Sequence, residues 1–156
     1  MAKSVAIKKQ GMAWKDTIAS KCRYGGIAGQ IWGDWNILWE DSEADYQGHA
    51  SFLAEKNGAY CFYEWWYGSC SGCDTWESKD YGDGAVQNEM RKTALWLDDE
   101  QQLMKWLNML EGRAPVSNHS DGGIVGNLDI LSGGLLGRVN AIRAVFGMPP
   151  YTPPEK

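Results

Sequence analysis

The chain has 156 residues, of which 44% are hydrophobic and 22% charged, a composition typical of a globular protein rather than a disordered one. Its net charge of −5 repels phosphate backbones, which excludes general nucleic-acid binding. No apolar run approaches the roughly 20 residues that span a bilayer, and residues 1–9 lack the apolar stretch of a secretory signal, so we expect a cytoplasmic protein with reduced cysteines and no membrane contact.

The first predicted element is a short helix. Met12, Ile18 and Cys22 lie at rough helical spacing, which predicts a helix over residues 12–23 that ends at Gly25-Gly26.

The next segment is ambiguous between a helix and a strand. Trp32, Trp35 and Trp39 are three and four residues apart, as on one helix face. We nevertheless expect a strand at about residues 35–42, because the hairpin that follows needs a third strand to be stable.

Residues 48–67 carry the clearest pattern, a β-hairpin. Asn57-Gly58 separates two strand-like runs and is the preferred dipeptide of a type I′ turn, whose two-residue loop also sets the register. In that register Ala50 faces Trp65 on one side of the hairpin, with Phe52 opposite Tyr63 and Ala54 opposite Cys61. On the other side His49 faces Trp66, Ser51 faces Glu64 and Leu53 faces Phe62. Both sides of the second strand are apolar, which predicts a central strand covered on both faces.

Three further helices are expected in the second half of the chain. The first covers residues 85–97, and the second follows a capping box formed by Asp98 and Gln101 and ends at Gly112. The third covers about residues 132–146, and a Pro-rich extended tail follows it. The apolar residues that define these helix faces are Val86, Met90, Ala94 and Leu97, then Leu103, Trp106, Leu107 and Leu110, then Leu135, Leu136, Val139, Ile142 and Phe146.

Together these elements predict an α+β fold. We expect a small antiparallel sheet of about three or more strands, with the hairpin 48–67 at its centre, packed with three to four helices. The whole chain, residues 1–156, is expected to form a single domain, because its length is the commonest for one domain and no boundary is visible.

Cys70-Ser-Gly-Cys73 is the motif that most resembles a chemical site. Two cysteines at this spacing supply half of a zinc site, and the remaining ligands would have to come from Cys22, His49, Cys61 or His119. The spacing also occurs in redox-active pairs, but the neighbouring Asp74 and Glu77 would raise the thiol pKa instead of lowering it. The reading we favour is a tight turn whose thiols pack as small hydrophobic groups.

The hairpin register also defines a candidate ligand site. His49, Ser51 and Glu64 fall on one side of it, as a polar trio suited to ligand binding or acid–base work. The alternative is the wetter face of an ordinary sheet. Trp65 and Trp66 are expected to line the pocket as rings for stacking, although tryptophans are more often core residues.

Two stretches of the chain resemble small proteins encoded by bacteriophages. They are Asp45-Tyr-Gln-Gly48 and Tyr63-Glu-Trp-Trp-Tyr-Gly-Ser-Cys-Ser-Gly-Cys-Asp-Thr-Trp-Glu77, in which an aromatic strand runs into a Gly-Ser-Cys-Ser-Gly-Cys-Asp motif. The resemblance spans about residues 45–77. It implies an origin in a phage or prophage and carries no catalytic residue across.

These observations lead to three functional hypotheses. The first is a phage accessory protein in the host cytoplasm that binds rather than catalyses, inhibiting or sequestering a host defence protein or a small nucleotide-like signal. The second is a virion structural or assembly protein. The third is a zinc-binding or thiol-redox protein built on Cys70 and Cys73. No other cofactor is expected, and homo-oligomers are compatible with all three.

Overall fold

The computed structural model describes residues 10–68, 83–113 and 134–152. By its internal contacts the chain divides into two compact units, residues 11–98 and the rest. The single-domain organisation expected above stays a prediction. None of the helices in the described ranges is long and apolar enough to cross a membrane.

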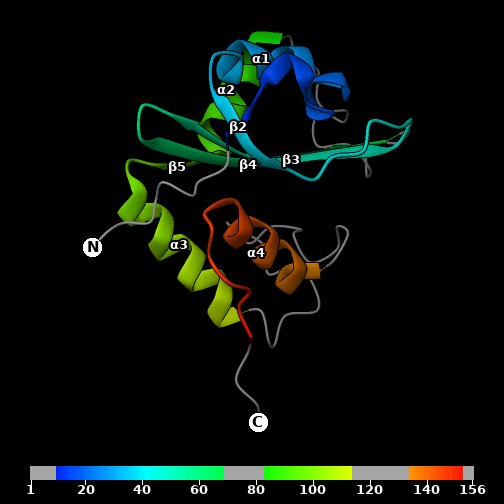
Figure 1. Ribbon diagram of the computed structural model, residues 1–156. Helices are drawn as coiled ribbons and strands as arrows, with labels where there is room; N and C mark the ends of the chain where they lie inside the picture. Colours follow the sequence, from blue (N-terminus) through cyan, green and yellow to red (C-terminus); the bar gives the residue numbers. More distant parts are fainter. Residues whose placement is uncertain (1–9, 69–82, 114–133, 153–156) are drawn as a thin grey trace. The chain divides into compact units, whose positions relative to one another are not determined.

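The larger unit contains a five-stranded antiparallel sheet in the order β1-β2-β3-β4-β5. Its strands are β1 (Met12–Ala13), β2 (Asn36–Glu40), β3 (Gly48–Lys56), β4 (Ala59–Tyr67) and β5 (Leu95–Leu97). Helices α1 (Gly25–Trp32) and α2 (Asp83–Thr93) lie on the same face of this sheet (Figure 1). The smaller unit contains α3 (Glu100–Arg113) and α4 (Gly134–Val145). The predicted α+β fold with a small antiparallel sheet is therefore confirmed.

The hairpin and its register are confirmed pair by pair. Nine pairs run from Gly48 opposite Tyr67 to Lys56 opposite Ala59. Asn57 and Gly58 have φ values of 53° and 87°, the positive values that a type I′ turn requires. The expected third strand is also present, as β2 paired with β3.

The core of the larger unit lies between the sheet and helices α1 and α2. Trp32 is fully buried and contacts Phe52 edge to face, with ring centroids 5.1 Å apart. It also stacks on Tyr63 at 5.3 Å. Residues on the opposite face of β3 and β4, such as Leu53 and Phe62, are buried as well. Strand β4 thus carries buried apolar side chains on both of its faces, as its apolar pattern predicted.

The predicted helix over residues 12–23 is wrong. This segment forms β1 and two short 3-10 turns, Trp14–Asp16 and Ala19–Lys21. Gly25, where the predicted helix was expected to end, is instead the first residue of α1. The cause is a distant carboxylate: Glu40 accepts hydrogen bonds from the main-chain N–H groups of Ile18 and Ala19 at 2.9 and 3.1 Å. Those two donors are therefore capped by a strand residue, and the helix does not continue through them.

Two predicted helix boundaries are also corrected. The helix expected over residues 85–97 ends at Thr93, because Leu95–Leu97 pairs with β4 as the fifth strand. The residue that caps α3 is Asp99 and not Asp98, since its Oδ1 accepts a 2.9 Å hydrogen bond from the N–H of Gln102. The buried face predicted for α3 is confirmed, with Leu103, Trp106, Leu107 and Leu110 all buried.

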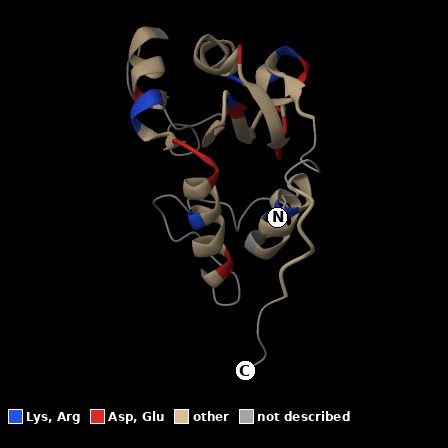
Figure 2. Cartoon of the chain, turned by 60° about the vertical axis from the view of Figure 1, so that its left-hand side comes forward, with Lys and Arg blue, Asp and Glu red and all other residues tan. Residues whose placement is uncertain are grey.

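Charges at the ends of these helices follow the helix dipole. Arg91 and Lys92 lie in the last turn of α2, whereas the first turn of α3 carries Glu100. Figure 2 colours the basic residues blue and the acidic residues red along the chain. Helix α4 ends at Val145, and the predicted stop residue Gly147 follows it with a φ of 72°. The N–H of Met148 bonds back to the Arg143 carbonyl at 3.0 Å. Beyond it, Asn140 holds Tyr151 through two hydrogen bonds, of 2.7 and 3.4 Å.

Candidate binding site at the open end of the hairpin

The hairpin brings four of the five predicted ligand-binding residues to one face. His49 lies opposite Trp66, and Ser51 lies opposite Glu64. Since side chains alternate along a strand, these four share a face, and Trp65 points to the other. The structure thus separates Trp65 from the group.

Trp65 is a core residue. Only 1% of its surface is exposed, its ring lies near Phe52 and Tyr63, and its Nε1 donates a 2.9 Å hydrogen bond to the Arg23 carbonyl. Trp66, by contrast, is 42% exposed. Of the two tryptophans expected to line a pocket, Trp66 is the one that a ligand can reach.

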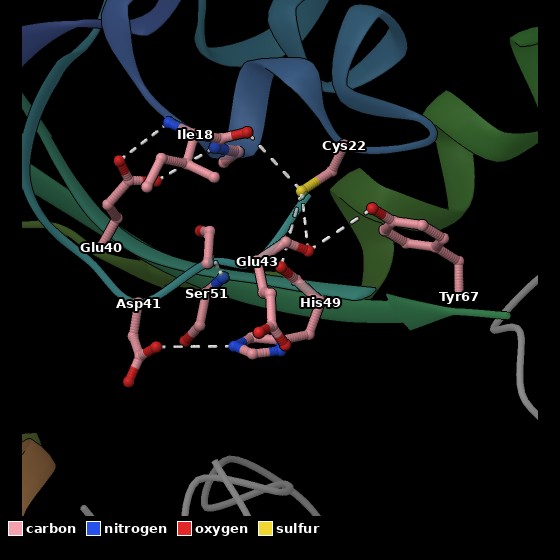
Figure 3. Close-up of polar contacts among 10 residues, drawn as sticks. Ile18, Cys22, Glu40, Asp41, Glu43, His49, Ser51 and Tyr67 are labelled. Carbon is pink, nitrogen blue, oxygen red and sulfur yellow. Dashed lines mark hydrogen bonds and ion pairs between the residues drawn. The ribbon is translucent and has the colours of Figure 1, made fainter. Parts of the chain in front are cut away.

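His49 is oriented by an aspartate that the sequence reading missed. Its Nε2 lies 3.5 Å from Oδ1 of Asp41, and about a fifth of each side chain is exposed (Figure 3). Asp41 directly follows β2, so its approach to His49 depends on how β2 pairs with β3. A bulge between Ile37 and Trp39 shifts that pairing, and the sequence carries no mark of it.

The same end of the hairpin is tied to the segment before α1 through Cys22. Its Sγ lies 3.5 Å from the carbonyl oxygen of His49 and 3.7 Å from that of Glu43 (Figure 3). Burial raises the pKa of the Cys22 thiol above its ordinary value, and the hydrogen bond to the neighbouring Tyr67 hydroxyl only partly offsets this effect. Burial likewise raises the pKa of Tyr67 to about 12. Both groups stay protonated at neutral pH, so Cys22 holds the backbone and is not a nucleophile.

Ser51 does not complete a nucleophilic triad with His49 and Asp41. Its side chain is fully buried, which closes it to a substrate. Its main chain instead pairs with the end of β2: the carbonyl accepts a 2.8 Å hydrogen bond from Asp41 and the N–H donates to the Ser42 hydroxyl at 3.4 Å. Ser51 thus acts as a structural residue, and half-buried Glu64 lies directly across from it.

The predicted metal ligands Cys70 and Cys73, together with His119, lie outside the described residues. Among the described residues, no group of three or more His, Cys, Asp or Glu side chains is placed to hold a metal ion. Cys61, another candidate ligand, is buried in the core, and burial raises the pKa of its thiol to about 12. Zinc binding at Cys70 and Cys73 stays a prediction.

The connection between β2 and β3, residues 41–47, forms an exposed acidic loop. Glu43, Asp45 and Tyr46 are exposed, and Tyr46 reaches 74%. The base of the acidic loop is closed by two main-chain hydrogen bonds between Glu43 and His49, of 2.8 and 3.2 Å.

Gly48 lets the acidic loop close tightly. A Cβ atom at this position would lie 2.1 Å from the Glu43 carbonyl oxygen and 2.5 Å from the Tyr67 hydroxyl oxygen, closer than real Cβ atoms approach. The Tyr67 hydroxyl itself donates to that Glu43 carbonyl at 3.5 Å. The acidic loop therefore projects from a base held by three neighbouring segments of the chain.

Comparisons of the sequence with protein-family models, with curated proteins and with solved structures find no match. The function is therefore inferred from the residues of this chain.

Proposed function

We propose that the protein is a phage-encoded accessory protein that acts in the host cell by binding a host protein, and that the acidic loop with Tyr46 at its tip contacts a basic surface of that partner. The observation that carries the proposal is Tyr46 itself, 74% exposed on a loop whose base is closed by hydrogen bonds. Tyrosine is enriched at protein interfaces because it supplies a large contact area at a low cost in side-chain entropy.

The geometry of the loop base supports a preorganised interface. Gly48, Cys22 and Tyr67 all meet the Glu43 carbonyl region, so the loop need not be ordered when a partner binds. A binding segment that is already ordered avoids much of the entropy cost of association. Trp66, opposite His49 at the base of the loop, adds a second exposed ring on the hairpin.

The charge of the loop favours a basic protein over a phosphorylated ligand at this end of the hairpin. Asp41, Glu43 and Asp45 fall within five residues, and the whole chain carries a net charge of −5. Such a field attracts Lys- and Arg-rich surfaces and repels phosphates.

The test is affinity purification of the tagged full chain from infected host cells, compared with the variants Tyr46→Ala and Asp45→Lys. A partner that binds through the acidic loop should be depleted at least tenfold by either substitution, since interface tyrosines often contribute more than about 1.4 kcal/mol. Its retention should also fall as salt rises.

Asp16→Lys is the matched control for Asp45→Lys, because it makes the same change in net charge at an exposed residue outside the loop. Equal loss with both lysine variants would mean that total charge, not the loop, governs binding. Finding the protein in purified phage particles would favour the virion hypothesis and contradict an intracellular accessory role.

A further inference from the structure

Trp96 is an exposed indole at the edge of the sheet, away from the acidic loop. It lies on β5 opposite Cys61, which is three residues beyond Gly58 of the Asn57-Gly58 turn. The acidic loop is at the other end of the hairpin. Trp96 is 41% exposed.

Two tryptophans and one main-chain hydrogen bond fix the orientation of the Trp96 ring. It stacks on Trp32 with centroids 6.0 Å apart and planes 22° from parallel, and Trp35 meets it edge to face at 5.9 Å. Its Nε1 donates a 2.8 Å hydrogen bond to the Arg91 carbonyl. Trp32 is fully buried, so the exposed Trp96 ring is the outer member of an aromatic cluster that extends from the core.

The helix end that this ring contacts carries two exposed cations. Arg91, whose carbonyl holds the indole, and Lys92 form the last turn of α2, and both are exposed. The nearby Lys56 is paired with Asp34, so its charge is already compensated. A preorganised aromatic surface that contacts a helix end with two exposed cations suits a ligand that combines a planar ring with an anionic group.

We propose that Trp96 is a second binding site, for a small nucleoside phosphate whose base stacks on the indole while Arg91 and Lys92 contact the phosphate groups. This inference goes beyond the proposed function, because it uses none of the residues of the acidic loop. Two exposed cations on an acidic protein can attract a small anion where a long nucleic acid is repelled.

The test is calorimetric titration of the full chain with adenosine, AMP, ADP and inorganic pyrophosphate at low salt. Stacking together with charge contacts predicts that ADP binds more tightly than either adenosine or pyrophosphate, and that its affinity falls as salt rises. Trp96→Ala should weaken ADP binding about tenfold or more. Trp66→Ala, which removes a tryptophan of similar exposure on another part of the sheet, should leave it unchanged.

A double variant, Arg91→Glu with Lys92→Glu, tests the site without touching the aromatic cluster. It should abolish ADP binding while leaving the melting temperature within a few degrees of the wild-type value. The proposal is overturned if none of the nucleotides binds at millimolar concentration, if pyrophosphate binds as tightly as ADP, or if Trp96→Ala or the double variant binds ADP like the wild type.

Discussion

The indole nitrogen of Trp65 donates a 2.9 Å hydrogen bond to the main-chain oxygen of Arg23, 42 residues earlier in the chain. This contact joins the end of the hairpin to the turn before α1, where Tyr24 adopts a φ of 72°. A residue expected to bind a ligand thus holds the position of a helix.

Replacing Trp65 with Phe keeps an aromatic ring but removes this donor. The variant should lose about 1–3 kcal/mol of unfolding free energy, from the missing hydrogen bond and the smaller ring. Urea denaturation measures the loss. Trp66→Phe is the control at the exposed neighbour and should change stability by less than about 0.5 kcal/mol. Equal losses in the two variants would contradict the burial assigned to Trp65.

Backbone conformation predicts opposite effects on stability for Gly→Ala substitutions at Gly58 and Gly26. Gly58 has a φ of 87° with open space around it, so Gly58→Ala should cost about 1–2 kcal/mol through backbone strain alone. Gly26 lies in α1, also with open space around it and without a positive φ, so Gly26→Ala should stabilise by about 0.4–1 kcal/mol. Thermal melts of both variants would show the two signs, and a stabilised Gly58→Ala would rule out the type I′ turn.

Stability should fall at alkaline pH. Burial raises the pKa of Cys61 from 9.0 to about 12 and that of Tyr63 from 10.0 to about 12. In the folded protein both groups stay protonated to a higher pH than in the unfolded chain. Their contribution to the free energy of unfolding is therefore complete below pH 9 and is lost between pH 9 and 12, by at most about 1.4 kcal/mol per pH unit per group.

Urea denaturation at pH 7, 9 and 10.5 would measure this slope. Cys61→Ala should make it shallower, whereas a change at an exposed tyrosine, Tyr46→Phe, should leave it unaltered. A wild-type stability that is constant up to pH 10.5 would contradict the burial of these groups.

In the smaller unit, Arg143 of α4 contacts Glu111 of α3 at 2.5 Å, with only 12% and 11% of the two side chains exposed. Glu111→Gln should cost about 3 kcal/mol, because it leaves the Arg143 charge without its anion. The double variant Glu111→Leu with Arg143→Met removes both charges and should lose less than the single variant. Urea denaturation distinguishes the two, and equal losses would mean that the pair itself contributes the stability.

The sequence predicted which residues of the candidate site share a face of the hairpin. It did not predict which of these side chains are buried and which are exposed to a ligand. The register placed His49 opposite Trp66 correctly because a two-residue turn leaves no freedom to slip. The same register put Trp65 on the other face, but its burial depended on the helices that cover that face. The acidic stretch at residues 40–45 is typical of a solvated loop, and the structure exposes residues 43–47. The closed base of the acidic loop could not be predicted, because the contacts of Cys22, Gly48 and Tyr67 come from three separate segments.

The sequence by itself determined the elements whose energetics are local. The hairpin depends on two adjacent residues with positive φ, and the buried face of α3 depends on a spacing of three and four residues. Only the tertiary structure decided where distant groups compete with local preference. Glu40 takes the N–H groups that a helix over residues 12–23 would have used, and the edge of β4 takes Leu95–Leu97 as a strand. Contacts between residues far apart in the chain have energies comparable to local propensities, so the local pattern cannot reveal them.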